Sequence, residues 1–319
     1  MPKLTNPSHL STPARLILTG IILLCIFFLI LLILPNFHPV AFFPGLHQPS
    51  AAQAETKLPP PPPLPTKSAQ APSLDLQAQG IIAIDTVTGA ILFEQNPDIE
   101  LMPASTTKLM TALVALDAYS LDQIITIDQE DRTIGNTMKL VKSEQLTVSD
   151  LLYGALVASG NDAALALALS YPNGGYTGFV AAMNQKAADL GLTHTHYQNV
   201  SGVESPGHVT TARDLSRLTL EALNNSTLRR IVATKKVLVT STDGKYHHQL
   251  VSTNELLGTV DGVMGVKTGW TENAGECLVT YVSRNNHSII TVILDSPDRF
   301  GESQQLIDWI YSNYTWTNS

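Results

Sequence analysis

The sequence is poor in cysteine and in clustered positive charge. Its only cysteines, Cys25 and Cys277, lie far apart, so they build neither a disulfide framework nor a cysteine metal cluster. No cluster of lysine and arginine occurs, and the formal net charge is −8. Because a protein normally needs a basic face to bind a polyanion, this composition excludes nucleic acid as an expected partner.

The histidines form no recognisable metal-binding motif. Nine are present, and the pairs His247–His248 and His194–His196 come closest to the spacing of zinc ligands. Neither pair belongs to a His-Glu-x-x-His arrangement. We therefore expect no metal site and no other cofactor.

Charge is also scarce near the N-terminus, where residues 16–34 carry none and end at Pro35. At about 1.5 Å per residue in a helix, this run is long enough to cross the hydrocarbon core of a bilayer. Lys3 and Arg15 precede it, and the positive-inside tendency then leaves residues 1–15 in the cytoplasm. The run predicts a transmembrane signal-anchor. The chain would then be a single-pass protein of the cell membrane, with everything after the anchor on the extracytoplasmic side.

A cleaved signal peptide is the alternative interpretation of this run. The sequence Ala52-Gln53-Ala54 offers a cleavage site, but it lies farther beyond the apolar run than is usual. Residues 35–76 contain the row Pro59–Pro63 and then Pro65, a composition that cannot bury a core. They predict an extended, proline-rich extracellular stalk. The folded domain is expected over residues 77–319.

Hydrophobic periodicity predicts that this domain has helices between two groups of strands. The β-rich runs 80–85 and 90–94 predict a hairpin. Helical spacing follows at 105–118, 147–158, 161–170, 177–190 and 211–224. Strand-like runs return at 231–240, 247–252, 276–283 and 288–295, before a final amphipathic helix at 299–312. Strands at both ends predict a mixed α/β (α+β) fold with one antiparallel sheet, built from the N- and C-terminal strands and flanked by helices.

Ser105 and Lys108 are the first candidates for a chemical site. Pro103 precedes an apolar, alanine-rich segment with helical spacing, so Ser105 falls near a helix N-terminus. Lys108 lies one turn later on the same face, where its amine can reach the Ser105 hydroxyl. A serine hydroxyl is a weak nucleophile until a base takes its proton, and lysine can be that base when burial or a second cation lowers its pKa. The alternative is a helix start with a capping serine and a surface lysine.

Two further motifs carry polar groups that suit a catalytic site. Ser159 and Asn161 stand between two helical segments, where the serine can relay a proton and the amide can hold a substrate carbonyl and a lysine amine. Lys267, Thr268 and Gly269 lie in a β-prone stretch. There the lysine gives a fixed positive charge, the threonine a hydroxyl for a carboxylate, and the glycine close backbone approach. Taken singly, each motif also occurs in ordinary turns and strand ends.

The order of the three motifs is far more specific than any one of them. Ser-x-x-Lys, Ser-x-Asn and Lys-Thr-Gly, in this order, resemble the motif set of penicillin-binding proteins and class A β-lactamases. The flanking words MPASTTKLMTALVAL, LLYGALVASGNDAALALA and GVMGVKTGWTENAGECLV are similar to the D-alanyl-D-alanine carboxypeptidases, the low-molecular-mass penicillin-binding proteins. The resemblance covers about residues 76–312 and implies a DD-peptidase/β-lactamase-like fold for the catalytic domain.

The resemblance also implies a role for each motif residue. Ser105 would attack the carbonyl between the last two D-alanines of a peptidoglycan stem peptide and form an acyl-enzyme, with Lys108 as its base. Ser159 would pass protons, and Asn161 would hold the peptide. Lys267 would lower the pKa of Lys108 and of Ser159. Penicillins and other β-lactams would acylate the same serine as covalent inhibitors.

The remaining assignments concern substrate binding. Thr268 would help to hold the terminal carboxylate of the peptide. The backbone N–H of Ser105 and one from the strand after Gly269, which we assign to Thr271, would form the oxyanion hole. Arg299, in the word RFGES, matches a family arginine near the carboxylate pocket.

The sequence therefore predicts a serine-type D-Ala-D-Ala carboxypeptidase that removes the terminal D-alanine from stem pentapeptides. A DD-endopeptidase or a transpeptidase of the same fold is an alternative, and so is a peptidoglycan-binding protein whose catalytic residues have decayed. A class A β-lactamase is disfavoured, because no Glu-x-x-Leu-Asn motif lies between Asn161 and Lys267.

Overall fold

The computed structural model describes residues 62–128 and 133–317. The predicted signal-anchor at 16–34 and most of the predicted stalk lie outside these residues. Within the described part of the chain, no helix is both long and apolar enough to span a membrane.

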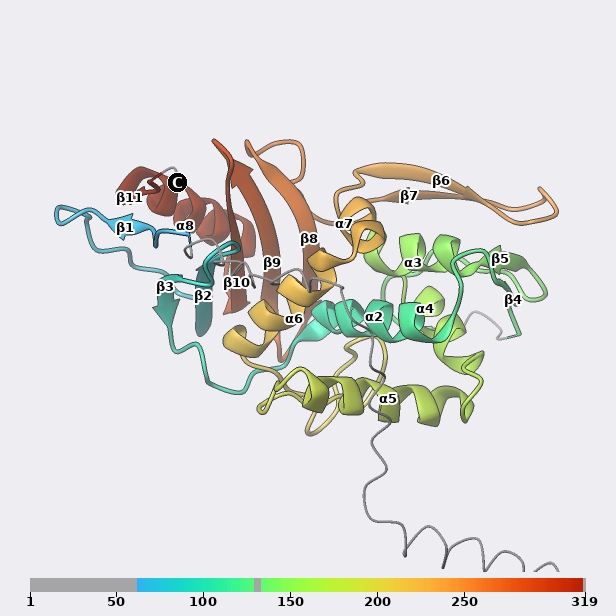
Figure 1. The fold of residues 1–319 in the computed structure, drawn as a ribbon. Coiled ribbons are helices and arrows are strands. Elements are labelled where there is room, and N and C mark those ends of the chain that lie inside the picture. The colour runs from blue at the N-terminus through green and yellow to red at the C-terminus, as the bar shows by residue number, and fades with distance from the viewer. Residues whose placement is uncertain (1–61, 129–132, 318–319) are drawn as a thin grey trace, which may run out of the picture. The chain divides into compact units, whose positions relative to one another are not determined.

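A five-stranded antiparallel sheet forms the centre of the fold (Figure 1). In spatial order its strands are β3 (Ile91–Gln95), β2 (Gly80–Asp85), β10 (His287–Ser296), β9 (Gly275–Arg284) and β8 (Val263–Thr271). Two strands come from the beginning of the domain and three from its end, so the predicted sheet built from both ends is confirmed. β8 is an edge strand, which leaves one of its sides free for a site.

The strands are apolar on both faces because both faces of the sheet are covered. Successive side chains of a strand point to opposite faces. Along β2, Ile82 and Ile84 therefore join the larger core among the helices, whereas Ile81 and Ala83 join a second core beneath α8 (Arg299–Asn313). This double burial explains the nearly uninterrupted apolar runs of β2 and β10.

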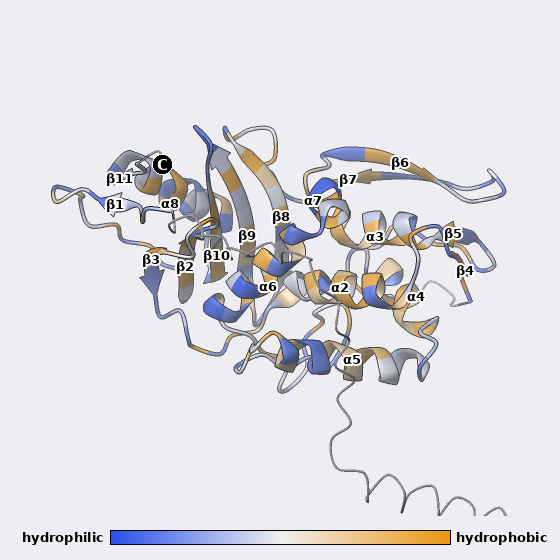
Figure 2. Cartoon of the chain, in the orientation of Figure 1, coloured by the Kyte–Doolittle hydropathy of each residue, from blue (hydrophilic) through white to orange (hydrophobic). Residues whose placement is uncertain are grey.

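The larger core belongs to a lobe of six helices. These are α2 (Lys108–Ala118), α3 (Val148–Leu156), α4 (Asn161–Leu169), α5 (Gly175–Asp189), α6 (Ala212–Asn224) and α7 (Ser226–Val232). α6 contacts β2 and β10, while α8 covers the opposite face of the sheet (Figure 1). α2 consists mostly of hydrophobic residues (Figure 2), and most of its side chains are buried within this lobe.

Two small two-stranded antiparallel sheets flank the lobe. β4 (Ile124–Thr126) pairs with β5 (Gln145–Thr147), and β6 (Lys236–Thr240) pairs with β7 (His247–Val251). The strand expected at 231–240 is wrong in its first part, since α7 continues to Val232 and β6 starts only at Lys236. The Asn225 side chain accepts from two backbone N–H groups of the first turn of α7, and this cap starts a helix where the apolar run suggested a strand.

The folded domain begins earlier than residue 77. β1 (Thr66–Lys67) pairs with β11 (Tyr314–Thr315), next to α8. Trp309 Nε1 donates to Pro72 O at 2.9 Å, and Leu76 is buried. Residues 66–76, which the stalk prediction includes, thus contact the C-terminal end of the domain. Proline has no N–H, but its carbonyl still accepts, so a proline-containing segment can be held by donors from α8.

Candidate active site

Ser105 lies in the short 3-10 helix η2 (Ala104–Thr107), which leads directly into α2. Ala104 has a φ of 45°, a conformation that side chains with a Cβ adopt only where surrounding contacts enforce it. Two glycines approach this turn closely. An added Cβ at Gly269 would lie 3.0 Å from Ser105 N, and one at Gly202 would lie 1.8 Å from Ala104 O. The close approach expected of Gly269 is present, and its neighbour is the backbone of Ser105.

The Lys108 amine contacts Ser105 and is fully buried. Its Nζ donates to Ser105 Oγ at 2.8 Å and to Ser201 O at 2.9 Å. Ser105 Oγ lies 3.4 Å from the same carbonyl. The Ser201 carbonyl therefore fixes the amine beside the hydroxyl, as the spacing of the two residues predicted.

Lys267 has a parallel arrangement in β8. Its Nζ donates to Ser159 Oγ at 2.8 Å and to Thr268 O at 2.9 Å, and its side chain is buried. Ser159 joins α3 to α4 with a φ of 58°, a left-handed conformation. This conformation of Ser159 lies in the short connection between α3 and α4, where the serine side chain contacts Lys267 of β8.

The two lysines influence one another electrostatically. Burial, and after it the charge of Lys267, hold the pKa of Lys108 well below its usual range, and Asp162 opposes this effect. Burial and then the charge of Arg299 lower the pKa of Lys267 to about 7. Burial beside a second cation therefore favours the neutral amine of Lys108, which makes it suited to act as a base.

Asn161 starts α4 and holds a neighbouring segment. Its Nδ2 donates to Ile134 O at 2.7 Å, and its backbone N–H donates to Asn136 O at 2.7 Å. Within the described residues, the Asn161 Oδ1 atom is buried and accepts no hydrogen bond. A buried acceptor of this kind normally has a partner, so a bound ligand could supply the donor.

Thr268 and Arg299 lie along β8 and at the start of α8. Thr268 Oγ1 is 2.5 Å from Thr253 Oγ1. Arg299 Nη1 donates to Gly269 O at 2.8 Å, which places the guanidinium beside the strand that carries Lys267. Among the described residues, the Arg299 Nε atom is buried without a partner.

Thr271 ends β8, where it pairs with Gly275 at the turn into β9. Its Oγ1 accepts from Ala274 N at 3.2 Å, so the hydroxyl stabilises the turn. Glu204 crosses to the same turn and accepts from Asn273 N at 2.7 Å. Thr271 is thus at the cleft, but its side chain is engaged in the structure of the turn.

A cleft of about 750 Å³ brings the three motifs together. The predicted site residues that line it are Ser105, Ser159, Asn161, Thr268, Gly269, Thr271 and Arg299. The sequence did not identify Ser201 and Thr253, which also line it. Ser201 contributes a backbone carbonyl, for which the amino-acid type gives no signal. Thr253 contacts Thr268 only because the folded chain brings these two distant residues together.

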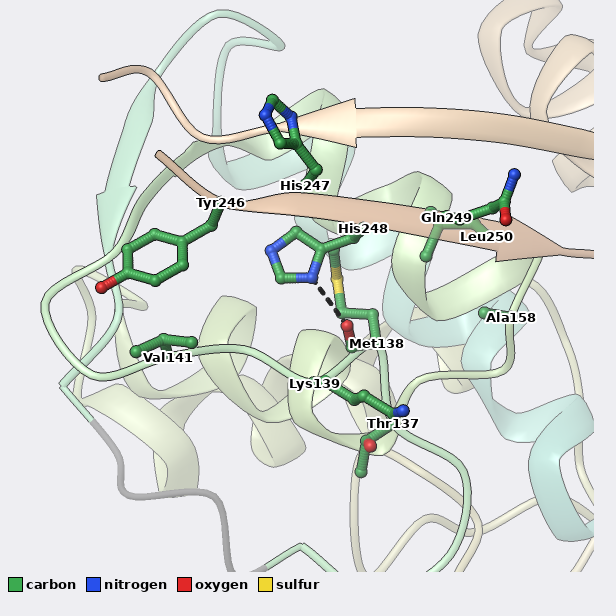
Figure 3. A pocket seen from close by; sticks show the side chains of 10 residues that line it. All are labelled: Thr137, Met138, Lys139, Val141, Ala158, Tyr246, His247, His248, Gln249 and Leu250. Carbon is green, nitrogen blue, oxygen red and sulfur yellow. Dashed lines mark hydrogen bonds between the residues drawn. The ribbon is translucent and has the colours of Figure 1, made fainter. Parts of the chain in front are cut away.

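His208 and His248 are buried and have protein partners. His208 Nε2 lies 2.8 Å from Thr107 Oγ1. His248 Nδ1 lies 2.8 Å from Met138 O (Figure 3). Its Nε2 lies 2.5 Å from Glu144 Oε1. Among the described residues, no group of three or more His, Cys, Asp and Glu side chains could hold a metal ion.

A helical lobe on an antiparallel sheet, with a serine–lysine pair at their junction, is the arrangement of the DD-peptidase class that the motifs resemble. A family model described as D-alanyl-D-alanine carboxypeptidase matches residues 65–298, and this chain belongs to that family. The resemblance seen in the sequence is thereby confirmed.

Individual relatives agree with this assignment. The chain is 32% identical to D-alanyl-D-alanine carboxypeptidase DacF of Bacillus subtilis over 75% of its own length, and it spans 63% of the length of that relative. It is 34% identical to the D-alanyl-D-alanine endopeptidase of Pseudomonas aeruginosa, covering 85% of this chain and 86% of the relative. The crystal structure of the Streptomyces K15 DD-transpeptidase superposes with a TM-score of 0.72 at 31% identity, covering 76% of this chain and 99% of that one.

Proposed function

We propose that this chain is a serine-type D-Ala-D-Ala carboxypeptidase acting on peptidoglycan stem pentapeptides. The observation that carries the proposal is the 2.8 Å contact between a fully buried lysine amine and the Ser105 hydroxyl. The lowered pKa of Lys108 favours its neutral amine, and a neutral amine can accept the hydroxyl proton.

Acylation follows from this contact. Lys108 Nζ takes the proton of Ser105 Oγ while the oxygen attacks the carbonyl carbon of the penultimate D-alanine. The peptide C–N bond then breaks, and the departing D-alanine amine takes a proton that Lys108 returns, with Ser159 Oγ as a relay. The product is an ester between Ser105 and the shortened peptide. Water then hydrolyses the ester and restores the serine.

Substrate binding uses the other two motifs. The positive charge of Lys267, with the Thr268 hydroxyl, holds the terminal carboxylate. Arg299 lines the same cleft and adds a second positive charge beside Gly269. The Asn161 amide supports the peptide through its Oδ1 atom, which lacks a protein donor among the described residues.

The oxyanion hole combines the N–H of Ser105 with an amide of β8. Successive residues of a strand direct their backbone groups alternately to opposite sides. Thr268 O accepts from Lys267 Nζ, so it faces away from β9, and Trp270 has the same orientation two residues later. This alternation favours the N–H of Trp270 over that of Thr271, which the sequence suggested.

The location of the activity rests on the sequence alone. We propose that residues 16–34 anchor the chain in the cell membrane and that the catalytic domain works on the extracytoplasmic side. The substrate, peptidoglycan, is present on that side. The charge-free run and the preceding Lys3 and Arg15 support this orientation.

A DD-endopeptidase is the second candidate. Its support is the Pseudomonas aeruginosa endopeptidase, to which this chain is 34% identical and of which it spans 86%. An endopeptidase would cleave a D-alanyl bond within a cross-linked dimer. The two activities differ in the amine that leaves when the Ser105 acyl-enzyme forms.

The test uses the full chain in detergent and a variant lacking the nucleophile. We expect a fluorescent penicillin to label the wild type covalently and not to label Ser105→Ala. We expect D-alanine release from a stem pentapeptide, and faster cleavage of that pentapeptide than of a cross-linked dimer. No label on the wild type, or equal label on Ser105→Ala, would rule out the nucleophile, and faster cleavage of the dimer would favour the endopeptidase.

A further inference from the structure

Residues 134–136 form part of one wall of the cleft, and they begin an irregular segment, residues 134–140, whose position no regular strand or helix fixes. Ile134 and Asn136 line the cleft and accept the two hydrogen bonds of Asn161 described above. An added Cβ at Gly135 would lie 2.9 Å from Asn161 Nδ2, so the segment passes directly against the amide. The orientation of the Asn161 side chain therefore depends on where this segment lies.

Met138 is the point at which the segment is held from two sides. Its N–H donates to Asp162 Oδ1 at 3.0 Å, on the side of α4. Its carbonyl accepts from His248 Nδ1 at 2.8 Å, on the side of β7 (Figure 3). His248 thus links the β6–β7 hairpin to the cleft wall through one backbone carbonyl.

The partners of His248 determine where its protons lie. A carbonyl oxygen can only accept, so Nδ1 carries a hydrogen that it donates to Met138 O. Nε2 faces Glu144 Oε1 at 2.5 Å, and one further proton lies between these two atoms. His248 and Glu144 are both buried, and the second carboxylate oxygen accepts from Val141 N at 3.0 Å. The ring is thereby fixed in one orientation, with Nδ1 directed at the wall.

Packing on this side of the wall is incomplete. A cavity of about 380 Å³ lies between residues 137–141 and β7, and it extends to Ala158, the neighbour of Ser159 (Figure 3). Because open space replaces side-chain contacts there, the hydrogen bond from His248 has a larger share in holding the wall.

We propose that His248, held by Glu144, is a positioning residue that fixes residues 134–140 and through them the Asn161 amide. The effect on catalysis rests on the proposed function, since acylation of Ser105 reports it. Removing the ring releases Met138 O, lets the wall shift, and misplaces the amide relative to the bound peptide. A misplacement of about 1 Å can slow a reaction by up to about a hundredfold.

The first measurement is independent of activity. Hydrogen exchange, followed by mass spectrometry on the full chain, reports protection of the amides at 134–140. We expect His248→Ala to increase exchange there on the order of tenfold. His247→Ala is the matched control, because His247 is exposed on the same strand and bonds Thr240 instead. Unchanged exchange in His248→Ala would overturn the inference, whether or not the protein binds penicillin.

The second measurement is the rate of acylation by a fluorescent penicillin. His248→Ala and His248→Gln are expected to acylate about tenfold more slowly, because the glutamine amide occupies the place of Nε2 and does not reach Met138 O. In His248→Asn the amide nitrogen occupies the place of Nδ1. The double variant His248→Asn, Glu144→Gln also removes the buried carboxylate, which would otherwise lose its partner. We expect this double variant to acylate within about twofold of the wild type.

Leu250→Ala controls for a general loss of stability, because it removes a buried apolar side chain from the same strand and leaves both partners of the His248–Met138 hydrogen bond in place. It should lower Tm as His248→Ala does and leave the acylation rate unchanged. If Leu250→Ala slows acylation equally, or if the double variant is as slow as His248→Ala, the positioning role is wrong. A wild type that takes no label contradicts the proposed function, and the exchange measurement then decides the inference.

Discussion

Two regions of the molecule bury a lysine amine in almost the same surroundings. At the start of α2, Lys108 Nζ donates to a serine hydroxyl at 2.8 Å and to a carbonyl at 2.9 Å. In β8, Lys267 Nζ makes a serine contact and a carbonyl contact at the same two distances. Geometry alone therefore does not distinguish the base from the fixed charge.

The difference lies in what surrounds each amine electrostatically. The charge of Lys267 lowers the pKa of Lys108, whereas the charge of Arg299 lowers that of Lys267, to about 7. Each lysine thus has a different cation as its neighbour, and the cation beside Lys108 favours the neutral amine that a base needs. The comparison teaches that the neighbouring charges, more than the hydrogen bonds, assign the two lysines their roles.

The largest effect is expected from removing the proposed base. Lys108→Ala should slow acylation by a β-lactam on the order of 10⁴-fold, because it removes the amine that contacts Ser105 Oγ. Stopped-flow acylation rates measure this. The matched control is Lys186→Ala, because Lys186 pairs with Asp117 in the helical lobe and should leave the rate unchanged. An Ala variant at Lys108 that acylates within tenfold of the wild type would contradict its role.

Removing the second lysine tests the coupling between the two. Lys267→Ala should slow acylation on the order of 10²-fold and raise the pKa of Lys108, because the repulsion from a neighbouring cation is gone. The rising limb of the pH–rate profile follows the neutral form of Lys108, so it should move to higher pH. A limb that stays in place would mean that burial alone sets the Lys108 pKa.

The wild-type profile should rise as Lys108 loses its proton and fall as Lys267 loses its own, at about pH 7. Arg299→Ala removes the cation that lowers the Lys267 pKa, so that pKa rises and the falling limb moves to higher pH. KM for the pentapeptide should also rise, by about tenfold, with the loss of a charged contact. The measurement is kcat/KM for D-alanine release from pH 5 to 10, and a falling limb unmoved in this variant would refute the assignment.

The smallest effect is expected from shortening the proline-rich segment. Deleting residues 58–65 leaves β1 and its pairing with β11 in place and lies far from both lysines in sequence. Activity on a soluble peptide, and both limbs of its pH profile, should remain as in the wild type. A loss of more than about twofold would show that these residues support the folded domain.

The sequence revealed Lys108 more readily than Lys267, for a physical reason. Ser105 and Lys108 are three residues apart, so helical geometry alone predicts their contact. The contact between Lys267 and Ser159 exists only because the sheet brings β8 against the α3–α4 junction, and the resemblance to a family, not periodicity, suggested it. The mixed fold and the sheet built from both ends could also be predicted, because β-prone apolar runs mark β2, β9 and β10 clearly.

Other features carried no local signal. The Ser201 carbonyl is a backbone group, and any residue could supply it. The helix α7 was hidden because its apolar residues Ile231 and Val232 continue into a strand-like run. His248 was considered only as a possible zinc ligand, since its partners Glu144 and Met138 O are distant in sequence. Sequence patterns predict contacts within one turn or one strand, and these contacts are long-range.

The pairing of β1 with β11 has a mechanical consequence. A pulling force on the chain ahead of Thr66 enters the domain at this two-residue ladder and at the Trp309–Pro72 bond, and α8 receives it first. The serine–lysine machinery lies on the other face of the sheet, in the layer of α2 and α4. Tension would therefore be borne by the layer of α8, and the reacting groups would keep their spacing under a pull from the proposed membrane anchor.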